Sequence, residues 1–142
     1  MIRALIWLFG IQSATASIIV NGNKVLLTKR SPLMVEGGKW CLPGGGMRKW
    51  ETALDSVKRE VFEEVGIKTE KIKFLFVHEE FSKRVKVHAN VFVYEIKFSG
   101  KVKINWEVSD YGWFSRSEIA KLDMAFSHKQ ILNKYFKLKG AK

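Results

Sequence analysis

The stretch "GGMRKWETALDSVKREVFEEVGI", residues 45–67, joins a glycine-rich start to an acidic segment with helical periodicity. Thr52 with Asp55 three residues later is a variant of the capping box, so we expect a helix to begin after Thr52. Four apolar residues recur at helical spacing and predict one buried face: Leu54, Val57, Val61 and Val65. Gly66 tolerates the left-handed conformation that ends many helices. The pattern predicts a helix of about four turns that ends at Gly66.

Three glutamates of this helix, Glu60, Glu63 and Glu64, share one face at positions i, i+3 and i+4. They crowd together in a chain that has 25 Lys+Arg and only 14 Asp+Glu. Such like charges destabilise an isolated helix by some tenths of a kcal/mol per pair. A divalent cation would remove the conflict, and carboxylate oxygens suit Mg²⁺ or Mn²⁺. For the cluster alone, a solvated acidic face on a surface helix is the competing interpretation.

The wider spacing favours the metal site. The fixed residues follow in this order: Gly45, five residues, Glu51, seven residues, Arg59-Glu60, then Val61, one residue, Glu63-Glu64, one residue, Gly66-Ile67. This segment resembles the Nudix box, G-x5-E-x7-R-E-U-x-E-E-x-G-U with U aliphatic, and it matches every fixed position. The flanking "WCLPGGG" and "WFSRSEI" are similar to the family's flanking segments, so the resemblance extends from residue 16 to about residue 122.

The resemblance implies a single Nudix domain over residues 1–142, with its box at residues 45–67. The implied fold class is α/β (α+β), a Nudix-type α/β/α sandwich with a mixed β-sheet and a loop–helix–loop. Members are mostly hydrolases that cleave a nucleoside diphosphate linked to another group, and they use Mg²⁺ or Mn²⁺. Mixed strands and helices in one short chain independently suggest a mixed sheet covered by helices.

Residue roles follow from the resemblance position by position. Glu63 and Glu64 match the glutamates that usually bind metal, and Glu60 matches one that binds metal or activates water. Arg59 matches the arginine that orients the others by pairing with the residue at Glu51. The carbonyl of Gly44, just before the box, often completes the metal site in the family.

Further candidates lie outside these positions. Some Nudix enzymes take another carboxylate from a loop near the last strands, where Glu107 and Asp110 are the candidates and surface exposure is the alternative. Arg30, Gly45 and Gly46 are candidates for substrate binding. The turn containing Lys83, Arg84 and Lys86 could meet phosphates, although a solvated basic edge is favoured. Four aromatics could stack a base or belong to the core: Trp40, Trp50, Phe81 and Tyr94. His78 and His88 lack metal-ligand spacing.

The pattern in the rest of the chain is typical of a small α/β domain. Asn21-Gly22 favours positive φ at both centres of a hairpin turn between strands at 16–20 and 24–30. Strands are also expected at 39–42, 71–80, 85–98 and 111–115, with a glycine loop at 44–46. Ser115 and Ser127 are expected to begin two short helices, the second with four inward residues: Ile131, Leu132, Tyr135 and Phe136.

The net charge of +11 suggests an anionic partner, or else a solvated lysine-rich surface. By elimination, the expected substrate is a nucleoside triphosphate, including an oxidised purine dNTP, which is split to monophosphate and pyrophosphate. ADP-ribose and dinucleoside polyphosphates stay as less favoured alternatives, because no proline follows Pro43 and "FSKRVKV" lacks the tyrosine typical of dinucleoside polyphosphate hydrolases in this family. A 5′-end RNA pyrophosphohydrolase and a non-catalytic nucleotide- or RNA-binding module stay open. Family members are often homodimers.

The single cysteine, Cys41, lies in an apolar run and is expected to be a core residue. A chain with one cysteine cannot form an internal disulfide, which fits a cytoplasmic location. The N-terminal "MIRALIWLFGIQSATAS" resembles a short signal peptide with cleavage after Ala16, but its apolar run is too short to span a membrane. A strand or helix packed on the domain is the favoured interpretation of this segment.

Overall fold

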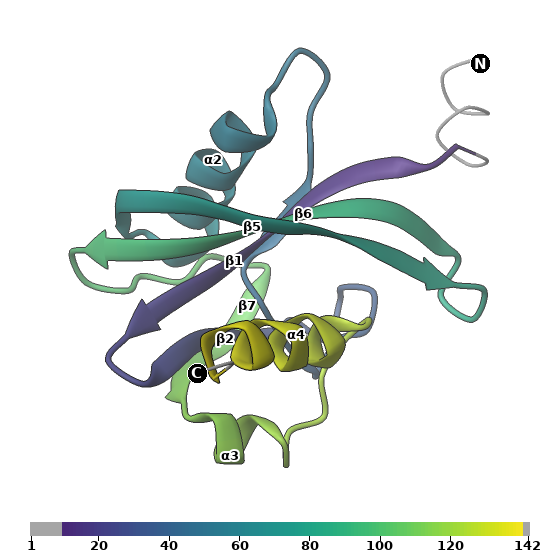
Figure 1. Cartoon of the computed structure of the whole chain (residues 1–142). Helices are drawn as coiled ribbons and strands as arrows, with labels where there is room; N and C mark the ends of the chain where they lie inside the picture. The colour runs from purple at the N-terminus through teal and green to yellow at the C-terminus, as the bar shows by residue number, and fades with distance from the viewer. Residues whose placement is uncertain (1–9, 141–142) are drawn as a thin grey trace.

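Strand β1 is the centre of the sheet in the computed structural model, which describes residues 10–140 (Figure 1). Within this range the sheet has seven strands: β1 Gln12–Asn21, β2 Lys24–Arg30, β3 Trp40–Cys41, β4 Gly44–Gly46, β5 Lys68–Ser82, β6 Val87–Ser99 and β7 Val108–Phe114. Three helices accompany them: α2 Ala53–Val65, α3 Arg116–Ile119 and α4 His128–Gly140.

The sheet is mixed because β1 has partners of both directions. Its main path runs β3-β2-β1-β6-β5. β6 pairs with β1 in parallel, in a register that sets Ala14 opposite Val91. β2 follows β1 through a hairpin and is antiparallel to it, while β4 pairs with β1 and β7 pairs with β2 off the main path. The parallel β1–β6 pair requires a long crossover, and the chain makes it through β2, β4, α2 and β5.

Helices cover both faces of the sheet. Consecutive residues of a strand point to opposite faces, so Ile18 and Ile19 of β1 enter different cores. Ile19 packs with the valines of α2, whereas Ile18 packs with residues of α3 and α4 such as Ile119 and Leu132. Figure 1 shows α2 on one side of the sheet and α3 with α4 on the other. The predicted α/β/α sandwich with a mixed sheet is confirmed.

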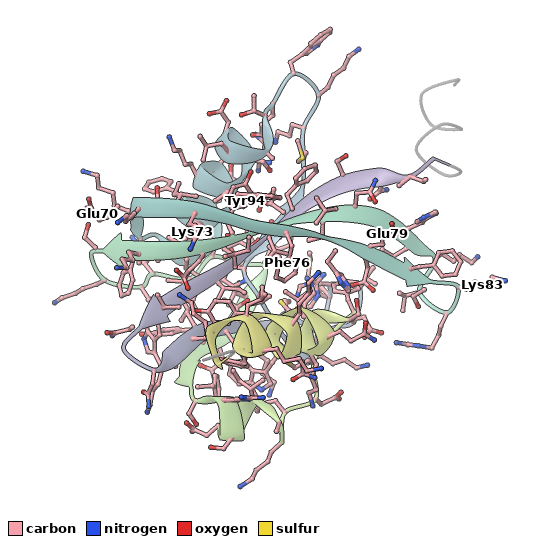
Figure 2. The ribbon with its side chains drawn as sticks, viewed as in Figure 1. Glu70, Lys73, Phe76, Glu79, Lys83 and Tyr94 are labelled. Carbon is pink, nitrogen blue, oxygen red and sulfur yellow. The ribbon has the colours of Figure 1, made fainter. Side chains whose placement is uncertain are left out.

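The long strand β5 forms one edge of this sheet. Its exposed positions include charged side chains, among them Glu70, Lys73 and Glu79, which Figure 2 marks along the strand. Phe76, between them, is buried against the core. Charged residues along an open edge discourage pairing with the edge of another molecule.

Helix α2 has the predicted ends. Thr52 Oγ1 accepts a hydrogen bond from Asp55 N at 3.1 Å, and Gly66 ends the helix at φ 68° with its N–H donating to Phe62 O. Val57, Val61 and Val65 are fully buried, as predicted. Leu54 is 43% exposed, so its assignment to the buried face is wrong.

Other elements differ mainly in their bounds. The hairpin turn is Gly22-Asn23, since Asn21 pairs with Lys24, and only Gly22 of these two residues has positive φ. The β5–β6 hairpin is longer than predicted at both ends of β5. The capping box of Ser115 and Glu118 has both hydrogen bonds, and α4 buries three of its four predicted core residues: Ile131, Leu132 and Tyr135. Cys41 is buried as expected, and burial raises the pKa of its thiol.

The glycine run was predicted as a loop, but Gly44–Gly46 forms the short strand β4 and pairs with Ala14–Ala16 of β1. Gly44 has φ 154°, and a Cβ built there would overlap the carbonyl oxygen of Thr15. The missing side chain therefore lets this segment approach β1 closely enough to pair.

Replacing Gly44 by alanine is expected to destabilise the protein by about 1–3 kcal/mol, because the new methyl group meets fixed backbone. Gly46→Ala is the matched control, since a Cβ at Gly46 meets no atom within 4 Å. Urea unfolding of the two variants measures the difference. Equal stability of both variants would show that β4 does not need a glycine at position 44.

β1 begins at Gln12, four residues before the predicted strand start, so Ala14, Thr15 and Ala16 lie inside the sheet. The cleavage position suggested by the sequence thus falls within β1 rather than at its edge. The expectation of a packed strand or helix over residues 1–9 lies outside the described residues. Within residues 10–140, no helix combines the length and apolar character needed to cross a bilayer.

Candidate active site

Arg59 is the centre of the ion-pair network on α2. Its Nε and Nη2 donate to the two carboxylate oxygens of Glu51 at 2.6 and 2.9 Å. Its Nη1 donates to Glu60 Oε1 at 2.9 Å and to Glu63 Oε2 at 3.2 Å. The bonds from Arg59 to Glu51, with a smaller effect of the hydrogen bond that Arg48 N donates to Glu51 Oε1 at 3.0 Å, lower the pKa of Glu51 to about 2. A planar guanidinium suits this task because it presents five donors in fixed directions.

Glu64, the third glutamate of the cluster, is only 6% exposed. Its Oε1 accepts a single long hydrogen bond, 3.4 Å from Gly44 N. Burial, followed by the nearby charges of Glu60 and Glu107, raises the pKa of Glu64 well above the ordinary value. A buried carboxylate with such weak compensation is unfavourable in the protein alone, and it favours a cation as a partner.

The glycine segment lies directly against the acidic cluster. A Cβ built at Gly45 would come within 2.8 Å of Glu60 Oε1. Gly46 O accepts a hydrogen bond from Arg59 Nη2 at 3.3 Å. The backbone at positions 44–46 therefore approaches the carboxylates in a way that a side chain at Gly45 would obstruct.

One cavity of about 410 Å³ collects most of the predicted site residues. The residues predicted for the site that line it are Arg30, Gly44, Gly45, Gly46, Arg59, Glu60, Glu63 and Glu107. Glu51 and Glu64 join them through the hydrogen bonds to Arg59 and Gly44. Arg30 is held by a 2.6 Å hydrogen bond from its Nε to Val35 O, and it lies over the ring of Phe126.

Several candidates lie elsewhere. Asp110 is exposed on β7, outside the cavity lining, and its Oδ1 accepts from the neighbouring Tyr111 N, so Glu107 is the better placed carboxylate. Arg84 pairs with Glu36 at 2.8 Å in an exposed turn. Four aromatics do not line the cavity: Trp40 packs on Phe114, Trp50 and Phe81 are exposed, and Tyr94 belongs to the α2 core.

The lining residues that the sequence did not predict for the site include Arg48, Glu80, Phe126 and His128. Glu80 lies on β5 and is 4% exposed, although in the sequence it is a charged residue at the end of a predicted strand. The alternation of Phe76, His78 and Glu80 on β5 is the signal that would have placed Glu80 on the inward face. Phe126 and His128 carried no signal, because they come from the segment around the start of α4.

His128 is held by a hydrogen bond from Leu42 N to its Nδ1 at 3.0 Å. Burial of the ring, with a smaller effect of the Arg30 charge, lowers the pKa of His128 to about 3. The ring is therefore neutral at pH 7 and accepts this bond. Since the unfolded chain protonates near 6.5, stability attributable to His128 should be complete above that pH and fall steadily as the pH drops toward 3.

We expect His128→Asn to flatten this acid loss of stability, because the Asn amide oxygen can still accept from Leu42 but does not titrate. Each unit of pKa depression corresponds to about 1.4 kcal/mol, so the effect should be a few kcal/mol at the acid end. His88→Asn on the exposed side of β6 is the control. Thermal unfolding followed across acid pH measures the loss of stability of each variant. Parallel stability profiles for His128→Asn and His88→Asn would refute the role given to His128.

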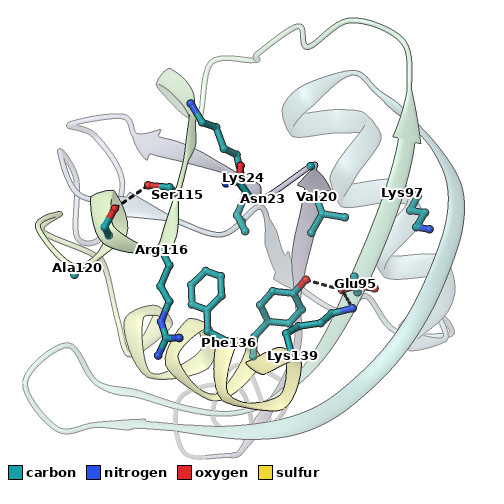
Figure 3. A pocket seen from close by; sticks show the side chains of 14 residues that line it. Val20, Asn23, Lys24, Glu95, Lys97, Ser115, Arg116, Ala120, Phe136 and Lys139 are labelled. Carbon is teal, nitrogen blue, oxygen red and sulfur yellow. Dashed lines mark hydrogen bonds and ion pairs between the residues drawn. The ribbon is translucent and has the colours of Figure 1, made fainter. Parts of the chain in front are cut away.

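A larger cavity of about 860 Å³ lies between the β1–β2 hairpin, α3 and the C-terminal half of α4 (Figure 3). There Glu95 Oε2 accepts from Tyr135 Oη at 2.6 Å and pairs with Lys139 at 2.8 Å. This acid is already compensated, and no residue of the 45–67 segment lines the cavity. The chemistry is therefore assigned to the smaller cavity beside α2.

The residues present fit a divalent cation. Glu60 and Glu63 already converge on one positive group, Arg59 Nη1, and the buried Glu64 carboxylate lies beside the Gly44 backbone. This set supplies only oxygen ligands, as Mg²⁺ and Mn²⁺ prefer. In the conformation described for residues 10–140, no three acidic, histidine or cysteine side chains surround one point closely enough to hold an ion.

A mixed sheet between helices on both faces, with an acidic helix facing a glycine segment, places the protein in the class of α/β/α sandwiches. The family model described as the NUDIX domain matches residues 11–135. The chain belongs to the Nudix hydrolase family, which confirms the resemblance and the prediction of an enzyme.

Two curated relatives show how far similarity extends. An ADP-ribose pyrophosphatase from Methanocaldococcus jannaschii is 30% identical over 129 residues, 89% of this chain and 74% of the relative. An 8-oxo-dGTP diphosphatase from Buchnera aphidicola subsp. Acyrthosiphon pisum is 30% identical over 116 residues, 76% of this chain and 89% of the relative. The two relatives share the family but differ in the substrates that their names give.

Solved structures agree on the fold. A MutT NUDIX hydrolase from Burkholderia pseudomallei has a TM-score of 0.73 and 28% identity, covering 85% of this chain and 93% of that one. A MutT protein from Methanosarcina mazei Go1 has a TM-score of 0.80 and 24% identity, covering 93% and 96%.

Proposed function

We propose that this Nudix hydrolase requires Mg²⁺ or Mn²⁺ and splits a nucleoside triphosphate, including an oxidised purine dNTP, into monophosphate and pyrophosphate. The observation that carries the proposal is the convergence of Arg59, Glu60 and Glu63 with the Gly44–Gly46 backbone on one cavity, beside the buried Glu64. A cavity of about 410 Å³ lies in the range of small-molecule sites.

Glu60, Glu63, Glu64 and the Gly44 carbonyl would hold the cation, and Glu107 is the additional carboxylate nearest to them. When bound, the cation would neutralise phosphate charge and lower the pKa of a coordinated water. Arg59 fixes the directions of Glu51, Glu60 and Glu63 through its hydrogen bonds. Glu60 acts either as a ligand or as the base that takes a proton from water.

Other residues of the cavity lining suit the phosphates of a nucleotide. Arg30 and the exposed Arg48 line the cavity and are placed to pair with phosphate oxygens, and Arg48 Nη2 lies 3.6 Å from Glu63 Oε1, beside the proposed cation. A Cβ at Gly46 would meet no atom within 4 Å, so this end of the glycine segment leaves room for the phosphates, and Gly45 lies directly against Glu60. The surplus of positive charge over the chain, +11 in total, favours the approach of such an anion.

ADP-ribose is the second candidate substrate, because the Methanocaldococcus relative with that name matches 89% of this chain. A 5′-triphosphate RNA, a dinucleoside polyphosphate and binding without turnover are the remaining alternatives. The intact set of Glu51, Arg59, Glu60, Glu63 and Glu64 speaks against a non-catalytic module.

A substrate screen with and without Mg²⁺ tests the proposal. It should compare NTPs, dNTPs, 8-oxo-dGTP, ADP-ribose, dinucleoside polyphosphates and 5′-triphosphate RNA, with products identified. The highest kcat/KM is expected for a nucleoside triphosphate. A steep loss of affinity with salt would instead favour RNA, and ADP-ribose as the best substrate would overturn the proposal.

A further inference from the structure

Glu80 is a buried carboxylate in the same cavity, on the other side from the acidic helix. It is 4% exposed and lies opposite Ala89 in the β5–β6 pair. The neighbouring Glu79 points away and is exposed. A buried carboxylate without a cation needs hydrogen-bond donors, and among the described residues Glu80 forms no ion pair.

The hydrogen bonds that the protein donates to Glu80 all go to one of its two carboxylate oxygens, Oε1. Ser127 N and Ser127 Oγ donate to Glu80 Oε1 at 2.9 and 2.7 Å. Because the single hydroxyl hydrogen of Ser127 is used in this bond, the 2.6 Å contact between His78 Nε2 and Ser127 Oγ requires His78 to donate. Within residues 10–140, Glu80 Oε2 has no hydrogen-bond partner.

The surroundings of Glu80 suit a flat heterocycle. The apolar residues of the cavity lining include Leu42, Val91 and Phe126, Arg30 lies over the Phe126 ring, and the small Ala89 is paired with Glu80 across β5–β6. Apolar walls with a few fixed polar groups are typical of a small-molecule site.

The chemistry of Glu80 selects among bases. An ionised carboxylate only accepts hydrogen bonds, so it favours an edge made of donors. Guanine presents N1–H and the N2 amino group side by side, and 8-oxoguanine keeps both. Adenine and cytosine place a ring acceptor next to their amino group, which a carboxylate oxygen would repel. Uracil and thymine offer one N–H between two carbonyls.

We propose that Glu80, held by Ser127, is the specificity-determining residue that selects a guanine-type base over adenine. The inference rests on the proposed function, since it takes the cavity to bind a nucleotide. It narrows the substrate class to guanine-type nucleotides and disfavours those that carry adenine.

Calorimetric titration with GMP, IMP and AMP in the presence of Mg²⁺ tests the inference on the wild-type protein. GMP should bind about tenfold or more tightly than AMP, with IMP weaker than GMP because it lacks the N2 amino group. Equal affinities for GMP and AMP, or tighter AMP, would overturn the inference. Binding does not require turnover, so this result is separate from the outcome of the substrate screen.

Glu80→Gln is the matching variant, because its amide oxygen can still accept from Ser127 while its NH₂ can donate to adenine N1. The GMP preference should fall by about tenfold or reverse, and the ratio of kcat/KM for GTP and ATP should follow. Glu79→Gln on the exposed face of β5 should keep the wild-type preference. A Glu80→Gln protein with unchanged preference would contradict the assignment, and if this variant does not fold, the wild-type GMP, IMP and AMP series decides.

Discussion

Replacing Glu63 or Glu60 by glutamine is expected to lower kcat by about 100-fold or more in the presence of Mg²⁺. Both side chains line the cavity and converge on Arg59 Nη1, so each is placed to meet a cation or the attacking water. Glutamine keeps the size of the side chain and removes its negative charge. Steady-state kinetics on the best substrate of the screen measures the loss.

The Mg²⁺ dependence separates the two roles left open for Glu60. Loss of a ligand should raise the Mg²⁺ concentration needed for half-maximal rate, whereas loss of the base should lower kcat at all Mg²⁺ concentrations. Stability of Glu63→Gln should hold or rise, because the repulsion within the cluster decreases. Asp55→Asn, on the first turn of α2 and outside the cavity lining, is the control that should keep full activity.

Replacing Arg59 by alanine is expected to lower kcat/KM by about 100-fold and also to destabilise the protein. Its side chain is only 17% exposed and bonds to three carboxylates and the Gly46 carbonyl. Without it, Glu51, Glu60 and Glu63 lose their shared partner. Arg59→Lys should recover only part of the activity, since an ammonium group cannot bond both oxygens of Glu51 in the same way.

The destabilisation caused by Arg59→Ala should become smaller as the pH falls. The pKa of Glu51 is lowered from 4.5 to about 2 by Arg59, so their pairing stabilises the fold fully above pH 4.5. That contribution is lost as the pH falls toward 2, and the stability gap between wild type and Arg59→Ala should narrow. Lys58→Ala, exposed on the same helix, is the control. A gap that widens in acid would contradict the role given to the Arg59–Glu51 pair.

Local signals predicted helix α2 well. Thr52, Gly66 and the valine spacing act within α2 itself, so the sequence contains the information that sets its ends and buried face. Leu54 shares the helical spacing of the three buried valines and is nevertheless 43% exposed, so spacing alone does not establish burial. The glycine run gave no side-chain pattern, and its pairing with β1 is a contact between distant segments that propensity does not encode.

The residues of the candidate site could be predicted where they follow a fixed spacing within one segment. The residues that come from distant segments could not. The spacing from Gly45 to Glu64 lies in one segment, and the structure brings those residues to one cavity or hydrogen-bonds them to its lining. Glu80 and Ser127 are 47 positions apart and meet only after β5 and α4 pack. Their role concerns which base is bound, and that part of the site had no motif to reveal it.

The most direct measurement is ³¹P NMR of the products formed from GTP by the wild-type protein, with Mg²⁺ and with EDTA. GMP and pyrophosphate are expected in the presence of Mg²⁺, and no turnover is expected in EDTA. Release of orthophosphate with GDP, or hydrolysis that continues unchanged in EDTA, would contradict the proposed function.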